Sequence, residues 1–289
     1  MLKQLLVSMR PRQWTKNLFI FAALLFDLKL FDLNYVGRTV SAFILFCILS
    51  GSVYLVNDLV DVEKDRQHPV KRDRPLPSGK LKRSWALAAA AVLPMISLTL
   101  SFLLDPLFGL LALTYLVIQL AYSFLLKEIA ILDVMVIAAG FVLRVAAGSV
   151  VAEAERFSPW LYVCITLLAL FLALGKRRNE LVLLEDTAGQ HRKILQEYSP
   201  ELLDEMMALV TSSTVIAYSL YTFSAENLPA NKSMMLTIPF VLYSIFRYLY
   251  LIHRKNLGGS PEEILIRDVP FIVSNLSWAV AVVSILYIL

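Results

Sequence analysis

The sequence is poor in the residues on which many soluble enzymes depend. It has two cysteines and three histidines in 289 residues, and only 17% of its residues are charged. Cys47 and Cys164 fall inside apolar runs without metal or redox spacing, so we expect both to be packing residues. His68, His191 and His253 lie in predicted loops without ligand spacing and are expected to face solvent. These absences argue against a histidine- or cysteine-ligated metal site and against a thiol redox centre.

The sequence also lacks a soluble domain, a low-complexity segment and a clear internal repeat, so we expect a single domain over residues 1–289. Its charged N-terminus is followed by an apolar run without a small-residue cleavage site, so no cleavable signal is expected. It is instead rich in apolar residues. With 58% hydrophobic residues and a mean hydropathy of +0.68, it cannot be an ordinary soluble domain. The composition predicts an all-α polytopic membrane protein.

Apolar runs of about 20 residues, the length that crosses a bilayer, recur along the whole chain. Asp27 and Lys29 interrupt the first of them. The runs predict a bundle of nine transmembrane helices, near Trp14–Leu33, Val40–Val56, Trp85–Leu104, Leu107–Leu126, Leu132–Val151, Pro159–Leu174, Met207–Phe223, Met234–Leu251 and Val269–Leu289.

Lysine and arginine are distributed unevenly between the two sets of connecting segments. Most of them fall in the N-terminus and in residues 57–85, 126–131, 175–206 and 252–268. The opposite set holds only Lys29, Arg38, Arg156 and Lys232. Because cytoplasmic loops carry the excess of basic residues, this asymmetry places the N-terminus and the charged loops in the cytoplasm. The pI near 9.0 then reflects cytoplasmic anchoring and anionic ligands, and no nucleic-acid partner is expected.

The stretch "NDLVDVEKD", which begins at Asn57, carries a row of carboxylates directly after an apolar run. On a helix, Asp58, Asp61 and Asp65 would lie within about 60° of one another, and Asn57 can join them. Hard oxygen ligands at this density suit Mg²⁺, which commonly bridges carboxylates to substrate phosphates. We therefore expect the three aspartates to be catalytic and to bind Mg²⁺ with Asn57. The alternative is a solvated helix end with internal ion pairs.

The stretch "KRDRPLPSG" follows the acidic row and contributes Lys71, Arg72 and Arg74. Its prolines disfavour a helix and stiffen the backbone. Arginine and lysine donors beside a metal-binding acidic row have the outline of a diphosphate site, because they neutralise the phosphate charge that the metal leaves. We expect all three to bind substrate phosphate. Membrane anchoring explains some of these cations but not the acids.

The second long charged loop begins "GKRRNELVLLED" at Gly175. Lys176 and Arg177 lie about one helical turn before Glu180, and further acids follow at the next turn. We expect the two cations to bind substrate and Glu180 to be a further metal ligand. Simple anchoring at the membrane surface is the alternative.

Arg144 stands inside the fifth predicted span, about 16 Å deeper than Asp133 on nearly the same helical face. An arginine that deep is costly and is by default a functional candidate that faces the bundle interior. The alternative is a structural pair with a buried polar group.

With these residues in view, the chain resembles the UbiA superfamily of intramembrane prenyltransferases over almost its whole length. "NDLVDVEKD" is similar to the first aspartate-rich motif of that family, and "KRDRPLPSG" is similar to the basic stretch after it. The resemblance implies a nine-helix bundle around a central cavity, with cytoplasmic cap loops near residues 57–85 and 175–206.

Within that superfamily, aromatic prenyltransferases usually carry a second DxxxD motif, whereas this chain has "KRRNELVLLE". That stretch and the N-terminal "RPRQWTKN" look like the branch that transfers phosphoribose from phosphoribosyl pyrophosphate to a polyprenyl phosphate, in cell-envelope polysaccharide synthesis at the inner membrane. The runner-up is transfer of a prenyl group from prenyl diphosphate to an aromatic quinone or haem precursor. A lipid or ion transporter is a third class, which predicts broken or repeated helices.

The chemistry of the phosphoribosyl reaction agrees with the residues present. A polyprenyl phosphate is already an anionic nucleophile, so no general base is needed, and none stands out. The leaving diphosphate requires Mg²⁺ and cations. The donor's 5-phosphate requires further cations, for which the chain offers Lys16, Lys127, Arg144, Lys176 and Arg177.

Overall fold

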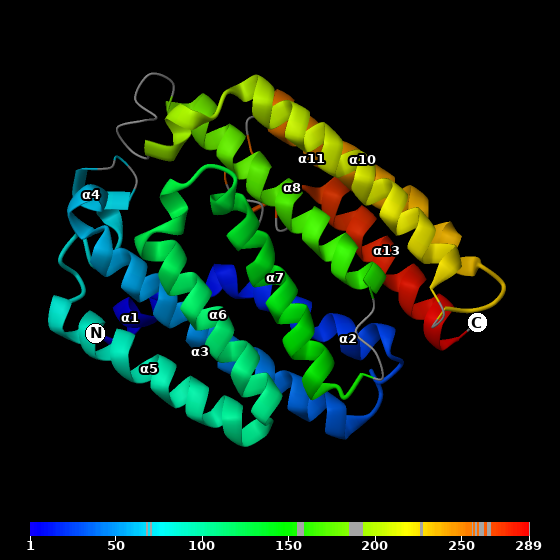
Figure 1. Cartoon of the computed structure of the whole chain (residues 1–289), viewed down its shortest axis with the longest axis horizontal. Coiled ribbons are helices and arrows are strands. Elements are labelled where there is room, and N and C mark those ends of the chain that lie inside the picture. The colour runs from blue at the N-terminus through cyan, green and yellow to red at the C-terminus, as the bar shows by residue number, and fades with distance from the viewer. Residues whose placement is uncertain are drawn as a thin grey trace. The chain divides into compact units, whose positions relative to one another are not determined.

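The computed structural model describes residues 1–67, 69, 71–154, 159–184, 193–225, 228–255, 257, 259, 263–264 and 267–288. Every regular element in these ranges is a helix, as the composition predicts (Figure 1). The chain divides into two compact units. The first consists of Met1–Leu24, Lys29–Val136 and Leu143–Ala154, and the second of Leu25–Leu28, Ile137–Val142 and Glu155–Leu289. The single-domain organisation over residues 1–289 stays a prediction.

The first unit contains seven α-helices in the described residues, two of which, α2 and α7, also contribute residues to the second unit. They are α1 (Leu2–Ser8), α2 (Phe21–Phe26), α3 (Leu33–Val60), α4 (Val62–Gln67), α5 (Arg83–Leu104), α6 (Pro106–Phe124) and α7 (Leu132–Val151). Short 3₁₀ helices cover Pro11–Ile20, Lys71–Asp73 and Leu126–Glu128.

The second unit contains the remaining described helices. They are α8 (Pro159–Leu184), α10 (Pro200–Ser224), α11 (Ile238–Lys255) and α13 (Val269–Tyr287), with 3₁₀ helices at Lys193–Glu197 and Ser233–Thr237. Helix α8 lies alongside α10, and α11 lies alongside α13 (Figure 1).

Eight helices of the described residues are long and apolar enough to cross a membrane, which makes the chain an integral membrane protein. They correspond to eight of the nine predicted spans: α3, α5, α6, α7, α8, α10, Ser233–Lys255 with α11, and α13. Helix α5 is the most exposed of them, since only 11% of its most apolar window is buried. A helix this apolar and this exposed faces lipid.

The first predicted span, Trp14–Leu33, is wrong as a continuous helix. The chain there forms the 3₁₀ helix Pro11–Ile20 and the short α2, which ends just before Asp27. Lys29 then donates hydrogen bonds to the carbonyl oxygens of Ala152 and Glu153, at 3.0 and 2.7 Å. A lysine committed to carbonyls at the end of α7 cannot continue an apolar span, so the polar interruption seen in the sequence ends the helix.

The core of the first unit forms where α3 and α6 pack together with the N-terminal 3₁₀ helix (Figure 1). Phe46 of α3 is fully buried against Phe108 and Tyr115 of α6, with ring centroids 5.8 and 5.3 Å apart. Ile20 and Ala147 are buried in the same cluster. The contact with α7 is close at Gly148, where a Cβ atom would lie 2.0 Å from the carbonyl oxygen of Ile20.

The core of the second unit is rich in aromatic side chains. Tyr218 hydrogen-bonds to Thr237 at 2.6 Å and accepts a hydrogen bond from the Trp278 indole at 2.7 Å. Tyr248 of α11 packs edge-on against Phe171 of α8 with centroids 5.1 Å apart. These contacts join α10 to α13 and α8 to α11 through rings that bury large areas, and the polar atoms of Tyr218 and Trp278 are hydrogen-bonded.

The glycine at position 148 provides a stability test. Gly148→Ala should destabilise the protein by about 1–3 kcal/mol, because the new methyl group would meet a backbone carbonyl that cannot move aside cheaply. Gly37→Ala in α3 is the matched control, since nothing lies within 4 Å of its Cβ position, and it should be neutral or slightly stabilising. Thermal unfolding of the purified variants in one detergent measures both. Equal melting temperatures for the two variants would refute the close approach.

Candidate active site

The acidic row lies at the end of α3 and in the short helix α4. Helix α3 runs on past the apolar segment to Val60, and Asp61 stands between the two helices. The Asp61 amide donates to the Asn57 carbonyl at 3.0 Å, and the Asp65 amide donates to the Asp61 carbonyl at 2.8 Å. The backbone therefore stays on a nearly helical path through the break, as the i, i+3, i+7 spacing requires.

Two of the three carboxylates share a single cation. The side chains of Asp58 and Asp65 are only 2% and 6% exposed. Nη1 of Arg74 lies 3.2 Å from Oδ1 of Asp58 and 2.7 Å from Oδ2 of Asp65. Nζ of Lys71 lies 3.9 Å from the other oxygen of Asp65. The basic loop that follows the acidic row in sequence thus folds back onto it and compensates charges that would be costly to bury alone.

Arg10 is a further partner of Asp58, and the sequence analysis missed it. Its guanidinium pairs with the Asp58 carboxylate and lies 4.7 Å from the ring centroid of Tyr54. Arg10 also has a left-handed backbone with φ of 55°, directly before Pro11. Such a conformation is strained for a non-glycine residue and persists only where surrounding contacts hold it. The available signal was "RPRQWTKN", which marks the N-terminus as more than a charged tail.

Asp61 has a different partner. Both of its carboxylate oxygens lie 3.0 Å from Nζ of Lys127, in the 3₁₀ turn between α6 and α7. In the part of the chain that the structure describes, no three carboxylate, histidine or cysteine side chains gather closely enough to hold a metal ion together. Asp58 and Asp65 are therefore joined through one cation, and Asp61 is held by another.

The chemistry of this donor set fits Mg²⁺. Carboxylate oxygens are the hard ligands that Mg²⁺ prefers, and it needs only one or two of them besides water and substrate phosphate. Arg74 places a positively charged nitrogen between the oxygens of Asp58 and Asp65, so this is a position where a cation is stabilised. Asp58 and Asp65 are the pair best placed to act as ligands, and the larger ligand set stays a prediction.

The ion pairs of this cluster join four cations, Arg10, Lys71, Arg74 and Lys127, to the three aspartates. Burial lowers the pKa of Arg74, and the nearby Arg10 lowers it further, whereas Asp58 and Asp65 act in the opposite direction. Arginine starts so far above neutral pH that Arg74 stays charged. The cluster therefore keeps an excess of positive charge, which suits an anionic ligand.

The other residues of the first unit that the sequence predicted to bind substrate differ in their burial. Asn57 and Lys16 are half-buried, in α3 and in the 3₁₀ helix Pro11–Ile20. Arg72 is exposed, and its side chain has no hydrogen bond or ion pair within the described residues. Their substrate-binding roles stay predictions.

Arg144 is buried in a polar network of the first unit. Its Nε donates to Oδ1 of Asn17 at 2.7 Å, and its Nη2 donates to the Tyr115 hydroxyl at 2.9 Å. Asn17 in turn donates to Cys47 Sγ and Ser50 Oγ, both at 3.2 Å. These contacts correspond to the structural pairing that the sequence left open, and they give Cys47 a polar neighbour besides its packing role. Asn17 and Tyr115 were not predicted.

The predicted residues of the second loop lie on α8, which extends ten residues beyond the predicted span end at Leu174. The Arg177 side chain is 2% exposed, and its Nη1 lies 2.6 Å from Oε2 of Glu180. Lys176 is half-buried. The charged stretch is thus a helix end whose ion pair lies within one turn. Residues 185 and 186, the acids that follow, and also His68 and His191, lie outside the described residues.

The second unit contains an ion cluster that the sequence did not predict. Arg178 of α8 makes two hydrogen bonds to Asp204 of α10, at 2.5 and 3.2 Å. His253 of α11 shares Asp204 at 3.1 Å and contacts the Leu249 carbonyl at 2.9 Å. The expectation that His253 is simply solvent-facing was therefore incomplete, because it is exposed but tied to a carboxylate. The cluster joins the ends of three helices.

Comparison with known proteins shows similarity to one protein family and to several of its members. The UbiA prenyltransferase family matches residues 18–262. A decaprenyl-phosphate phosphoribosyltransferase from Mycolicibacterium smegmatis is 36% identical, over 98% of this chain and 92% of the relative. Proteins of the same name from Mycobacterium tuberculosis and Corynebacterium glutamicum are each 34% identical, over 95% and 98% of this chain and 91% and 86% of the relatives.

Solved structures share the fold at lower identity. A UbiA homologue from Archaeoglobus fulgidus, bound to DMAPP and Mg²⁺, is 20% identical, with a TM-score of 0.74 over 99% of this chain and all of that one. A structure reported for digeranylgeranylglyceryl phosphate synthase is 18% identical, with a TM-score of 0.70 over 98% of this chain and 99% of that one. Both similarities concern the fold alone.

The acidic cluster predicts a response to Mg²⁺ that does not depend on turnover. Mg²⁺ should raise the melting temperature of the purified protein, because an ion that binds the folded state stabilises it. Asp65→Asn should raise the half-saturating Mg²⁺ concentration at least about tenfold, since a charged ligand is lost. Glu63→Gln, which changes an exposed carboxylate of the same helix α4, should leave the response unchanged. An identical response of wild type and Asp65→Asn would remove Asp65 from the metal site.

Proposed function

Because the chain belongs to the UbiA prenyltransferase family and is a membrane-embedded transferase, we propose that it moves 5-phosphoribose from phosphoribosyl pyrophosphate to a polyprenyl phosphate of the decaprenyl type. The observation that carries this choice is the similarity, over nearly the full chain, to relatives named decaprenyl-phosphate phosphoribosyltransferase. The missing second DxxxD motif supports it. The lipid product would serve cell-envelope polysaccharide synthesis.

We propose that Asp58, Asp61 and Asp65 hold Mg²⁺ together with Asn57, and that Glu180 is a further ligand. The UbiA homologue bound to DMAPP and Mg²⁺ supports a divalent metal in this fold. Bound Mg²⁺ supplies positive charge to the oxygens of the leaving diphosphate.

The cations of the cluster would change partners when the donor binds. Arg74 and Lys71 now neutralise Asp58 and Asp65, and Lys127 neutralises Asp61. With Asp58, Asp61 and Asp65 as metal ligands, these cations would bind phosphate oxygens, and no charge would be left unpaired in a partly buried site. Arg10, which pairs with Asp58, and Arg72, which lies in the same 3₁₀ helix as Lys71, would add donors. Lys16, Arg144, Lys176 and Arg177 are proposed for the remaining phosphate groups.

The bond changes need no base from the protein. A phosphate oxygen of the acceptor forms a bond to C1 of the ribose, and the bond from C1 to the diphosphate oxygen breaks. The diphosphate leaves with the electron pair, and its new charge falls on the site's cations. The protein's task is to position two anionic substrates and to offset their repulsion.

The donor can be identified directly. Purified wild-type protein with Mg²⁺ should move radiolabelled ribose phosphate from phosphoribosyl pyrophosphate into an organic-extractable lipid when given a polyprenyl phosphate. Lys176→Ala should weaken donor use by about 1–3 kcal/mol, the usual cost of one charge-assisted partner. Arg177→Ala should weaken it by a similar amount.

Lys255→Ala, which removes an exposed lysine at the end of α11, is the matched control and should keep wild-type kinetics. Label that moves from a prenyl diphosphate to an aromatic acid or a haem precursor, with none from phosphoribosyl pyrophosphate, would establish the runner-up reaction instead.

The orientation of the protein is proposed from the basic residues, with the N-terminus and the site at the cytoplasmic face. Single cysteines at the exposed positions Gln67 and Gln196 should be shielded from an impermeant thiol reagent in intact cells, and one at the exposed Ala230 should react. The background should lack Cys47 and Cys164. Lysed cells should label at all three positions. Labelling at position 67 or 196 in intact cells would reverse the orientation.

A further inference from the structure

The first unit has a pocket beside the acidic cluster that none of the proposed site residues lines. It has a volume of about 170 Å³, far above what one water molecule needs. Its lining comes from four segments: the end of α3, helix α4, the loop after Arg74 and the start of α5. The lining residues are Leu59, Val62, Glu63, Arg66, Leu76, Gly79, Leu81, Lys82 and Arg83.

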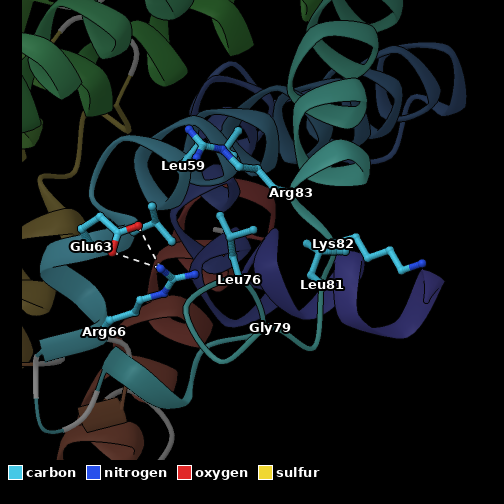
Figure 2. A pocket seen from close by; sticks show the side chains of 9 residues that line it. Leu59, Glu63, Arg66, Leu76, Gly79, Leu81, Lys82 and Arg83 are labelled. Atoms are coloured by element: carbon cyan, nitrogen blue, oxygen red, sulfur yellow. Dashed lines mark hydrogen bonds and ion pairs between the residues drawn. The ribbon is translucent and has the colours of Figure 1, made fainter.

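The pocket combines an apolar floor with cationic walls. Leu76, Leu81 and Val62 are buried and form the floor. Figure 2 shows the side chains of Arg66 and Arg83 reaching toward the same space, with Lys82 extending away at the rim.

Most of this positive charge is not neutralised within the described residues. Arg66 pairs with Glu63, its Nη1 lying 2.9 and 3.0 Å from the two carboxylate oxygens (Figure 2). The exposed side chains of Lys82 and Arg83 have no hydrogen bond or ion pair there. The lining residues therefore carry two positive charges in excess, of which that of Arg83 faces the pocket and that of Lys82 extends away at the rim (Figure 2). A pocket with an apolar floor and uncompensated cations fits an anion that carries apolar groups.

The position of the pocket indicates where that anion comes from. Arg83 begins α5, whose most apolar window is only 11% buried and so faces lipid. Trp85, in the first turn of α5, is 48% exposed, as is typical of aromatic residues at the level of lipid headgroups. Basic residues at this level attract anionic lipids by about 1 kcal/mol each.

We propose that this pocket binds the phosphate headgroup of an anionic phospholipid, held by Arg66 and Arg83 with Lys82 at the rim. The acyl chains would lie along the exposed face of α5. The lipid would also touch the loop from Leu76 to Leu81, which follows directly after Arg74. A bound lipid would therefore brace the segment that carries the cation between Asp58 and Asp65.

Native mass spectrometry of the full-length protein in detergent tests the proposal without any activity measurement. Titration with phosphatidylglycerol should give a first dissociation constant well below that for phosphatidylcholine. Arg83→Gln should weaken phosphatidylglycerol binding about fivefold, the effect of one cation at a membrane surface, and adding Arg66→Gln should weaken it further. Phosphatidylcholine binding should not change.

Lys80→Ala is the matched control, because it removes one exposed cation of the same loop that does not line the pocket. This variant should keep the wild-type preference for phosphatidylglycerol over phosphatidylcholine. Equal affinity for the two lipids, or an unchanged preference in the double variant, would overturn the proposal. Inorganic phosphate at millimolar concentration should displace the lipid only weakly, and complete displacement would assign the pocket to a free phosphate compound instead.

Discussion

Burying a carboxylate beside a bilayer is costly unless a cation meets it, and the first unit is organised around this constraint. Asp58 and Asp65 are almost fully buried, and a single guanidinium nitrogen of Arg74 contacts both. Three segments far apart in the sequence each bring a cation to the end of α3. They are the strained turn at Arg10, the basic loop at Arg74 and the 3₁₀ turn at Lys127. The carboxylates of the acidic row are thus neutralised from three separate segments.

The same constraint applies in reverse to cations in or next to the membrane-spanning helices, which also need partners. Arg144 contacts the amide oxygen of Asn17 and both the hydroxyl and the ring face of Tyr115. Lys29 takes the carbonyl oxygens at the end of α7, which are the acceptors that a helix terminus leaves open. Each arrangement also ties the N-terminal segment to α7. Polar groups in this unit thus serve as tertiary links where hydrophobic burial alone gives little direction.

In the proposed function, the ion pairs of the acidic cluster differ from these links because they would exchange partners when metal and donor bind. A guanidinium that neutralises two carboxylates in one state can bind phosphate in another, provided that a metal ion takes its place. Such an exchange requires the loop after Arg74 to stay in position while its charged end changes partners. Leu76 and Leu81, which belong to that loop, are buried in one cluster with Leu55 of α3 and Ala86 of α5, and this packing holds the loop in place. The proposed lipid headgroup would lie against the same loop, which would couple the site to the composition of the surrounding membrane.

The sequence alone determined the helical class, eight of the nine spans, the acidic row and the basic loop, because apolar length and i, i+3, i+7 spacing are local properties of the chain. It also showed where the first span is interrupted, at Asp27 and Lys29, although not that the segment becomes a 3₁₀ helix. Only the tertiary structure decided which cation meets which carboxylate. Arg10 and Asp58 are 48 residues apart, and Lys127 and Asp61 are 66 residues apart. Opposite charges attract each other at any separation in the sequence, so no local pattern identifies these partners. The packing of the helices determines which charged groups meet.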